Sequence, residues 1–220
     1  METPLLILAS ASPRRSELLR QLRPHFQIVP SPAAESSGEH WSAGELARVN
    51  ACRKARAVSN QFPDALVIGV DTLVAVGAAI FGKPRTRAEA RDMLASLQGR
   101  THQVTTGVCL VCKRARRQRV FYEQTDVTFR ALTPAQIRRY HQKVNPLDKA
   151  GAYGIQEQGG DLVESISGSF TNVVGLPLEK LGAELEAFLA ALAGQHARSL
   201  PFAPLPPSRP ASAHSRRAGP

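Results

Sequence analysis

The stretch Leu5-Leu-Ile-Leu-Ala-Ser-Ala-Ser-Pro-Arg-Arg-Ser-Glu-Leu-Leu-Arg-Gln-Leu22 decides the fold, because a buried strand passes directly into a helix within it. The apolar run over 5–9 predicts the strand, and the spacing of leucines over 13–22 predicts the helix. Ser12 suits the N-cap and Pro13 suits the first helical position. An immediate passage from strand to helix is typical of an α/β protein.

Two arginines, Arg14 and Arg15, occupy the first turn of this predicted helix. The helix dipole already places partial positive charge there, so acidic residues are normally favoured. Two cations are unfavourable at that end unless an anion lies beside them. Because backbone N–H groups and two guanidinium forks bind phosphate well, the pair indicates a phosphate site. A pair of solvated surface arginines is the alternative.

Signals for helix starts recur along the chain. Ser42-Ala-Gly-Glu45 and Thr86-Arg-Ala-Glu89 have the spacing of a capping box, and Thr133-Pro134 fits an N-cap followed by the first helical residue. We predict helices over 13–22, 43–60, 87–97, 134–143 and 172–192, the last beginning late or kinked at Pro177, and strands over 5–9, 27–30, 66–71, 73–81, 102–112, 119–130 and 161–166. The order is βαβα, then a long hairpin around 113–118, then βα, which predicts an α/β fold with a mixed sheet.

The composition is that of a globular protein with one good core or two closely joined lobes. Of its 220 residues, 43% are hydrophobic and 21% are charged. From about 195 onward the chain is rich in Pro, Ala, Ser and Arg. We therefore predict a folded domain over 1–194 and a disordered tail over 195–220.

No targeting or membrane segment is expected. The N-terminus has no basic region, and its apolar run is too short for a signal peptide. The longest apolar stretch, over 65–81, is interrupted by Asp71 and Gly77 and is typical of strands. We therefore expect a cytoplasmic protein without a membrane partner.

The formal net charge of +10 raises the hypothesis of a nucleic-acid partner. Part of this charge lies in the predicted tail, and a basic segment over 113–119 fits a hairpin tip and its approaches. Aromatic residues make up only 5% of the chain and show no stacking pattern, so nucleic-acid binding is weakly supported. Attraction of a small anionic substrate explains the charge equally well.

The three cysteines do not form a disulfide framework. Cys109-Leu-Val-Cys112 has the spacing of half a zinc site, but no second pair follows it. Residues three apart on a strand point to opposite faces, so the two sulfurs diverge. We interpret both cysteines as core residues.

Asp71 is an outlier, because it lies within the apolar run Leu66-Val-Ile-Gly-Val-Asp-Thr-Leu-Val74. A carboxylate there is costly unless it is paired, hydrogen-bonded or bound to a cation. We favour a general base or metal ligand at the end of a strand, since burial also tunes the pKa that a base needs. An aspartate that caps a tight turn between two strands is the alternative.

Two lysines stand out for different reasons. Lys54 lies amid small apolar residues on the inward sector of its helix, so we expect its ammonium to reach into a cleft; snorkelling to solvent is the alternative. Lys83 lies between Gly82 and Pro84 in a rigid turn. The run from Gly77 nearly matches a phosphate-binding P-loop, but Pro84 cannot supply the hydroxyl group that the motif requires, so we reject a P-loop.

The segment from Asp148 to Gln156 is a glycine-bearing loop that is dense in polar groups. Loops of this kind commonly hold ligands, and the amide of Gln156 can read a base edge through its paired donor and acceptor groups. An ordinary connecting loop is the alternative.

Seven short segments are informative because of the order in which they occur along the chain. They are Leu8-Ala-Ser-Ala-Ser-Pro-Arg-Arg15, Lys54-Ala55, Gly69-Val-Asp-Thr72, Gly82-Lys-Pro84, Gly99-Arg-Thr-His-Gln-Val-Thr-Thr-Gly107, Asp148 to Gln156, and Ser169-Phe-Thr-Asn-Val-Val-Gly-Leu-Pro177. Each segment is weak alone, but together they resemble the Maf family of nucleoside triphosphate pyrophosphatases from residue 5 to about 190. The resemblance does not explain the basic segment over 113–119 or the tail.

The resemblance implies an α/β fold similar to that of inosine triphosphatases. Such a fold has an elongated mixed β-sheet flanked by helices, with two lobes around a deep cleft, and often forms a homodimer. It also implies hydrolysis of a nucleoside triphosphate to the monophosphate and pyrophosphate with a divalent metal, Mg²⁺ or Mn²⁺, which removes non-standard or surplus nucleotides. The form Tyr153-Gly-Ile-Gln156 resembles the branch that acts on dTTP and UTP.

The resemblance assigns a role to individual residues. Asp71 is implied as the proton acceptor, and Glu35 matches an acidic position that we expect at the metal together with Asp71. Hydrolysis at an α-phosphate needs a positioned water, a base and positive charge on the triphosphate, which agrees with the outliers found from the sequence. The expected catalytic residues are Asp71, Lys54 and Lys83; the expected substrate-binding residues are Ser12, Arg14, Arg15, Thr72 and Gln156; the expected metal ligands are Glu35 and Asp71.

Other functions fit the same sequence. A non-catalytic nucleotide sensor or a basic nucleic-acid-binding protein would share its charge. A related house-cleaning enzyme would act on deaminated purine triphosphates. Pyrophosphate release, measured with a divalent metal and a panel of triphosphates, separates the enzymes from the sensor.

Overall fold

The structure is a computed structural model that describes residues 4–36 and 41–198, with side chains described up to residue 194. Its strands are β1 (Leu6–Leu8), β2 (Gln27–Ile28), β3 (Leu66–Val76), β4 (Ala79–Phe81), β5 (Thr101–Cys112), β6 (Arg117–Phe129) and β7 (Val163–Ser167). Its helices are α1 (Pro13–Leu22), α2 (Ala43–Ser59), α3 (Arg87–Leu97), α4 (Pro134–Lys143), α5 (Phe170–Val174) and α6 (Leu178–Arg198), with short 3₁₀ turns η1 (Ala150–Ala152) and η2 (Gly159–Asp161).

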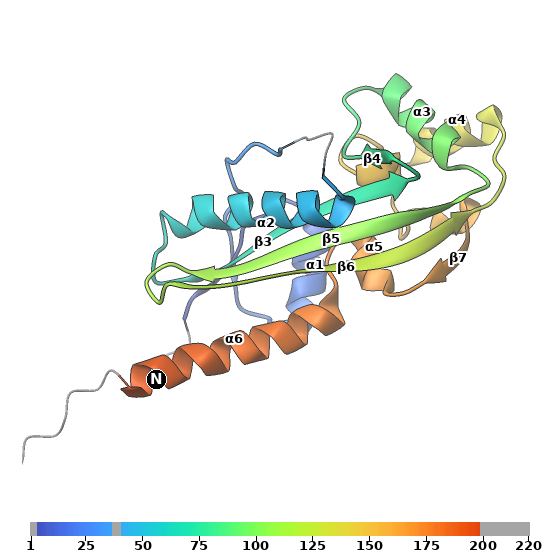
Figure 1. Ribbon diagram of the computed structural model, residues 1–220. Helices are drawn as coiled ribbons and strands as arrows, with labels where there is room; N and C mark the ends of the chain where they lie inside the picture. Colours follow the sequence, from blue (N-terminus) through green and yellow to red (C-terminus); the bar gives the residue numbers. More distant parts are fainter. Residues whose placement is uncertain (1–3, 37–40, 199–220) are drawn as a thin grey trace, which may run out of the picture.

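The strands form one mixed sheet. Its order is β2-β1-β3-β5-β6-β7, and β4 pairs with β3 outside this path. β1 is parallel to β2 and β3, whereas β3, β5, β6 and β7 pair antiparallel in turn. Figure 1 shows α2 on one face of the long strands and α6 on the other. The α/β fold with an elongated mixed sheet is therefore confirmed.

β3 differs from the prediction made from the sequence. The sequence predicts two strands that meet near Asp71, but the structure has one strand of 11 residues. Asp71 pairs with Gly107 of β5 in the middle of this ladder. The turn comes later, at Gly77, whose φ of 58° favours glycine. Asp71 therefore neither ends a strand nor caps a turn.

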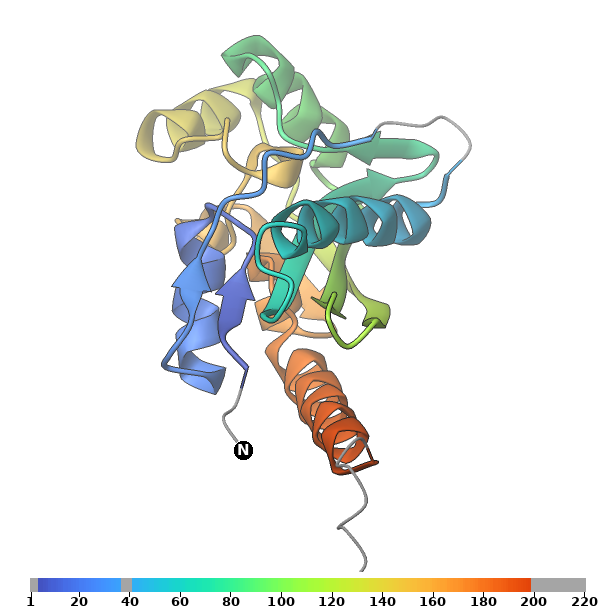
Figure 2. The same ribbon diagram turned by 90° about the vertical axis from the view of Figure 1, so that its left-hand side faces the viewer.

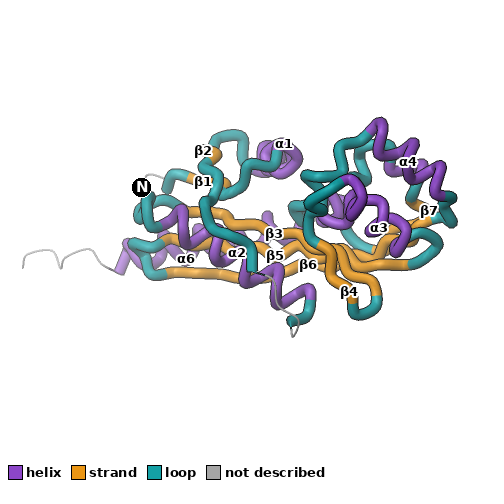
Figure 3. Tube along the Cα trace, turned by 90° about the horizontal axis from the view of Figure 1, so that it is seen from above, coloured by secondary structure: helices purple, strands orange, loops and turns teal. Residues whose placement is uncertain are grey.

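The two largest apolar clusters of the described residues lie toward opposite ends of the long strands. One core packs α1 and α6 against the sheet, with Leu19 and Leu181 fully buried. The other packs α3 and α4 around Leu94, Phe129 and Ile137. Figure 2 and Figure 3 show α3 and α4 grouped at one end of the sheet, away from α6. Each core stabilises one lobe, and the long strands β3, β5 and β6 run through both.

Two glycines allow α2 to lie very close to the sheet. A Cβ atom at Gly69 of β3 would come within 2.2 Å of the Ala51 carbonyl oxygen, and one at Gly107 of β5 within 2.4 Å of the Ala47 carbonyl carbon. Gly69 and Asp71 are two residues apart on β3, so both face the same side of the sheet. The close approach of α2 therefore brings its side chains within reach of Asp71.

The C-terminal helix of the prediction is two helices. α5 ends at Val174, where Gly175 has a φ of 122° and Pro177 follows. α6 then continues to Arg198, past position 194, where the sequence placed the end of the folded domain. The remainder of the predicted tail, 199–220, lies outside the described residues.

The basic hairpin between β5 and β6 has partners within the fold. Arg114 pairs with Asp64, and Arg119 forms a bidentate ion pair with Glu184 of α6. Cys109 and Cys112 are both buried, which confirms their interpretation as core residues. Within the described part of the chain, no helix is both long and apolar enough to cross a membrane.

Candidate active site

A cleft opens where β1 ends beside β3. Leu8, the last residue of β1, pairs with Ile68, while β3 continues to Val76. The chain leaves the sheet at this point to begin α1, at the carboxyl ends of the parallel strands, where open α/β sheets bind ligands. A cavity of about 380 Å³ lies here, which is a size typical of ligand sites.

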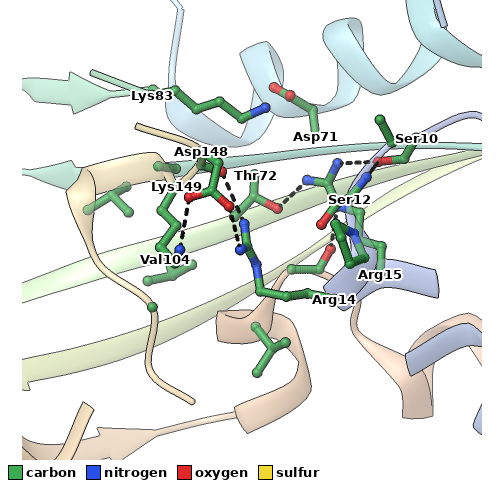
Figure 4. Close-up of a pocket in the computed structure, with 18 of the residues that line it drawn as sticks. Ser10, Ser12, Arg14, Arg15, Asp71, Thr72, Lys83, Val104, Asp148 and Lys149 are labelled. Carbon is green, nitrogen blue, oxygen red and sulfur yellow. Dashed lines mark hydrogen bonds and ion pairs between the residues drawn. The ribbon is translucent and has the colours of Figure 1, made fainter. Parts of the chain in front are cut away.

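Residues from both lobes line this cavity. All nine residues singled out from the sequence lie on it: Ser12, Arg14, Arg15, Glu35, Lys54, Asp71, Thr72, Lys83 and Gln156. Figure 4 shows Arg14 bonded to Asp148 and, separately, Arg15 bonded to Thr72, with Lys83 extending toward Asp71. The structure thus brings the complete predicted set together from widely separated segments.

Asp71 is 3% exposed and lies beneath α2. Lys54 Nζ lies 2.6 Å from Asp71 Oδ1 and 2.6 Å from Glu35 Oε1, so one ammonium bridges two carboxylates. Burial raises the pKa of Asp71 above that of an exposed aspartate, against the lowering effect of Lys54. A carboxylate of raised basicity in a fixed position suits a general base.

Lys54 reaches into the cleft, as predicted, and does not snorkel to solvent. Its side chain is only 13% exposed, and its ammonium is held by the two carboxylates. Burial alone would raise the pKa of Glu35, but Lys54 outweighs this and holds it below the usual value. Glu35 is therefore an ionised carboxylate at the edge of the cavity.

Asn50 was missed by the sequence analysis. It lies one helical turn before Lys54 on α2, is 1% exposed, and donates from Nδ2 to Asp71 Oδ2 at 3.1 Å. Residues four apart share one helix face, so a polar residue one turn from an inward lysine was the available signal. Both oxygens of Asp71 are thus held from the same helix.

Arg15 connects three elements around the cavity. Its Nε donates to the Gly175 carbonyl, its Nη1 to Ser10 Oγ and the Val70 carbonyl, and its Nη2 to Thr72 Oγ1. These four bonds leave one of its five N–H groups uncommitted. Burial lowers the pKa of Arg15 against the raising effect of Asp71, although a guanidinium stays charged. Arg15 therefore mainly holds these segments of the site together.

Thr72 lies in a directed chain of hydrogen bonds. It accepts from Arg15, its Oγ1 lies 3.0 Å from Thr106 Oγ1, and Thr106 donates to the Asn172 carbonyl. Because the proton of Thr106 is used toward that carbonyl, Thr72 donates to Thr106. The hydroxyl of Thr72 is thereby fixed at the floor of the cavity.

Arg14 and Ser12 line the cavity at the start of α1. Arg14 donates from Nη1 to Asp148 Oδ2 at 2.8 Å and from Nη2 to the Asp148 carbonyl at 3.0 Å, which joins α1 to the loop before η1. Three of its N–H groups make no hydrogen bond, although its Nη1 also lies 3.6 Å from Glu157 Oε1. Ser12 occupies the N-cap position, as predicted, but its side chain does not cap the helix. Its hydroxyl is available to a ligand.

Lys83 is the cavity lysine that carries no ion pair within the described residues, whereas Lys54 and Lys149 are both paired with carboxylates. It lies in the turn after β4 and extends toward Asp71 (Figure 4). Burial lowers the pKa of Lys83, against the raising effect of Glu35. An unpaired, half-buried ammonium in a cleft favours an anionic ligand.

Gln156 lies in an exposed turn at the mouth of the cavity. The loop that carries it is fastened from below: the Tyr153 hydroxyl contacts His102 Nε2 at 2.8 Å, and the Gly154 backbone contacts the Tyr140 hydroxyl. The side chain of Gln156 makes no hydrogen bond with other described residues, so both its donor and its acceptor remain open to a ligand.

The donor set of the cavity fits a hard divalent cation. No group of three or more metal-ligating side chains occurs among the described residues. Glu35 and Asp71 nevertheless converge on a single point, the position of Lys54 Nζ. Mg²⁺ typically takes one or two carboxylates and completes its coordination with water and substrate phosphates. Carboxylate oxygens are the type of ligand that Mg²⁺ and Mn²⁺ prefer, and a cation between Glu35 and Asp71 would take the place of the Lys54 ammonium.

These features define a class of protein. The fold is α/β with an elongated mixed sheet, and its cleft holds several cations around one buried carboxylate. A site of this kind suits a polyanion such as the triphosphate of a nucleotide.

Comparison with known proteins places the chain within this class. The family model described as "Maf-like protein" matches residues 5–188, and the chain belongs to this family. A relative from Symbiobacterium thermophilum, named dTTP/UTP pyrophosphatase, is 50% identical over 80% of this chain and 89% of its own length. One from Bacillus anthracis with the same name is 44% identical over 83% of this chain and 95% of its own length. Among solved structures, the Ham1 protein of Staphylococcus aureus has a TM-score of 0.46 and 17% identity over 83% of this chain and 98% of that chain.

Proposed function

We propose that this protein hydrolyses nucleoside triphosphates, dTTP and UTP above all, to the monophosphate and pyrophosphate. The observation that carries the proposal is the buried Asp71 in a cleft lined by Arg14, Lys54 and Lys83. The membership of the Maf-like family and the names of the relatives support the same activity. Removal of non-standard or surplus nucleotides in the cytoplasm is the physiological role that we propose.

The residues divide the reaction between them. Asp71 accepts a proton from a water molecule whose oxygen attacks the α-phosphorus. The bond between that phosphorus and the bridging oxygen to the β-phosphate breaks, and pyrophosphate leaves. Lys83 and the open N–H groups of Arg14 hold the phosphates and stabilise the charge that develops on them. Lys54 orients Asp71 and favours its ionised form, against the effect of burial.

We propose Asp71 and Glu35 as the residues that hold a divalent metal, Mg²⁺ or Mn²⁺. Such a cation would supply positive charge at the phosphates and lower the pKa of bound water. When no metal ion is bound, the ammonium of Lys54 compensates the negative charge of these two carboxylates.

Base recognition is assigned to the mouth of the cavity. Gln156 presents an amide whose donor and acceptor can pair with the edge of a pyrimidine. Thr72 is a second substrate-binding residue, and its fixed hydroxyl lies at the floor of the cavity. Ser12 completes the substrate site at the start of α1. The homodimer and the absence of a nucleic-acid partner stay predictions from the sequence.

The test is pyrophosphate release from dTTP and UTP in the presence of Mg²⁺ or Mn²⁺. Asp71→Asn keeps the shape but removes the base, and its single acceptor oxygen can serve only one of the two donors, Lys54 or Asn50. We therefore expect kcat to fall about 100-fold or more. Asp64→Asn is the matched control, because Asp64 is an exposed acid that pairs with Arg114 outside the cleft. Its kcat is expected to stay within about twofold of the wild type.

Three outcomes would contradict the proposal. Equal turnover by Asp71→Asn would remove the assigned base. Tight nucleotide binding without pyrophosphate release by the wild type would identify a sensor. Activity on inosine triphosphate alone would identify the house-cleaning class that acts on deaminated purines.

A further inference from the structure

Asn50 is a polar residue of α2 whose side chain makes three hydrogen bonds, although the proposed reaction gives it no part. Its side-chain amide is buried on α2 and contacts two different segments, β3 and the strap over 31–36 that carries Glu35. The Oδ1 atom accepts from the Ser36 backbone N–H at 2.7 Å, and Nδ2 donates to the Ser36 carbonyl at 3.3 Å and to Asp71 Oδ2 at 3.1 Å.

The amide of Asn50 can adopt only one orientation in this setting. A flipped amide would place its oxygen against Asp71 Oδ2 and the Ser36 carbonyl, and its NH₂ group against the Ser36 N–H. All three contacts would then be repulsive. Asn50 therefore uses both of its N–H donors and one acceptor lone pair, which fixes the amide rigidly.

Lys54 makes the corresponding pair of contacts one helical turn later. It joins Glu35 of the strap to Asp71 Oδ1, just as Asn50 joins Ser36 of the strap to Asp71 Oδ2. Two side chains of one helix thus define the position of both carboxylates. Only the Asn50 contact is neutral, so it orients Asp71 without adding a second positive charge beside the base.

We propose that Asn50 is a positioning residue for the reaction: it sets the direction of the Asp71 carboxylate and, through Ser36, holds the Glu35 strap beside it. The inference rests on the proposed pyrophosphatase function. Asn50 touches neither substrate nor the reacting atoms, so it acts through Asp71. Loss of this contact should slow turnover with little effect on the binding of the nucleotide.

The test compares three variants in the dTTP assay. Asn50→Leu removes every contact. Asn50→Asp keeps the shape and the acceptor for the Ser36 N–H but loses both donors, to the Ser36 carbonyl and to Asp71, and places a second carboxylate beside Asp71. Both are expected to lower kcat about 10- to 100-fold while KM for dTTP changes less than about threefold. Arg53→Gln is the matched control, because Arg53 lies on the same helix and donates to Ser36 Oγ but does not contact Asp71. Its kcat should match that of the wild type.

Two further measurements complete the test. Circular dichroism at the assay temperature shows whether each variant is folded, and a crystal structure of Asn50→Leu shows the Asp71 carboxylate directly. We expect a rotated carboxylate and a displaced strap. A strap fastener alone would make Arg53→Gln as slow as Asn50→Leu; that result would overturn the inference, as would an unchanged Asp71 in the crystal. If the wild type itself releases no pyrophosphate, the proposed function fails, and the crystal structure alone decides the role of Asn50.

Discussion

Arg15 has oxygen partners, as a cation at a helix N-terminus requires, but these oxygens belong to the protein and not to a ligand. Two cations at a helix N-terminus require negative partners, and the sequence points to phosphate for both. In the structure, Arg15 instead meets protein oxygens from β3, the segment after α5 and Ser10. Arg14 keeps more of its donors open. The sequence identified the pair but could not separate these roles, because the oxygens that bind Arg15 come from distant segments.

His102 makes the stability of the protein depend on pH. It is buried beneath the loop that carries Gln156, and burial lowers the pKa of His102 to about 4 from an ordinary value of 6.5. Between these two values the unfolded chain binds a proton at His102 that the folded chain does not. Stability is therefore expected to fall as pH decreases from 6.5 to about 4, by about 3 kcal/mol, with no contribution above that window.

The measurement is urea unfolding at several pH values between 4 and 7, compared with His102→Gln. The variant removes the titrating group, so its free energy of unfolding should depend less on pH over this range. Parallel pH profiles for the two proteins would show that His102 is not the group responsible.

Asp71 and Lys54 were predictable as single residues, since a charge in apolar surroundings is costly and therefore conspicuous in a sequence. Lys83 was conspicuous through its place in the turn between Gly82 and Pro84. Asn50 was not conspicuous, because a neutral polar residue on a helix is common and its value here depends on β3 and the strap. Glu35 came from the resemblance to a family and not from any local signal, whereas Gln156 was indicated by the polar loop that carries it.

At the scale of elements, the site depends on how closely α2 approaches the sheet. Gly69→Ala would place a Cβ atom against the Ala51 and Ala55 backbone, which cannot move without displacing the helix. We expect a loss of about 3 kcal/mol in the free energy of unfolding and a marked loss of activity, because Asn50 and Lys54 move away from Asp71.

Gly160→Ala is the control for this substitution. A Cβ atom at Gly160 would meet nothing within 4 Å, and its backbone is not in the left-handed region. Its free energy of unfolding should differ from that of the wild type by less than about 0.5 kcal/mol. Comparable losses in the two variants, measured by urea unfolding, would show that the close approach of α2 is not the controlling feature.

Local signals located most elements well. The capping box at Ser42 forms as its spacing predicts, and Thr133 is the predicted N-cap. At Thr86 only the N-cap bond forms, because the Glu89 carboxylate accepts from the Arg85 N–H instead. The division of β3 into two strands was wrong, because Asp71 resembles a strand breaker until its partners on α2 are known. The break between α5 and α6 was only partly anticipated from Pro177, since the φ of Gly175 contributes as much.

At the scale of the whole molecule, the cleft exists because two cores form at separate ends of one set of strands. The Arg14–Asp148 ion pair joins α1 to the loop before η1. Neither the two lobes nor this contact follows from composition or periodicity. The two lobes were implied by the order of the seven family segments, which records a three-dimensional arrangement that local patterns do not, and the contact between Arg14 and Asp148 was not anticipated.

The central claim is that this cleft holds a nucleoside triphosphate with its phosphates on the cations and its α-phosphorus facing Asp71. A crystal structure with the non-hydrolysable analogue α,β-imido-dTTP tests it most directly. We expect phosphate oxygens within hydrogen-bond distance of Lys83 and Arg14, and the thymine edge beside Gln156. A nucleotide bound elsewhere, or one with its base beside Asp71 and its phosphates in solvent, would contradict the account.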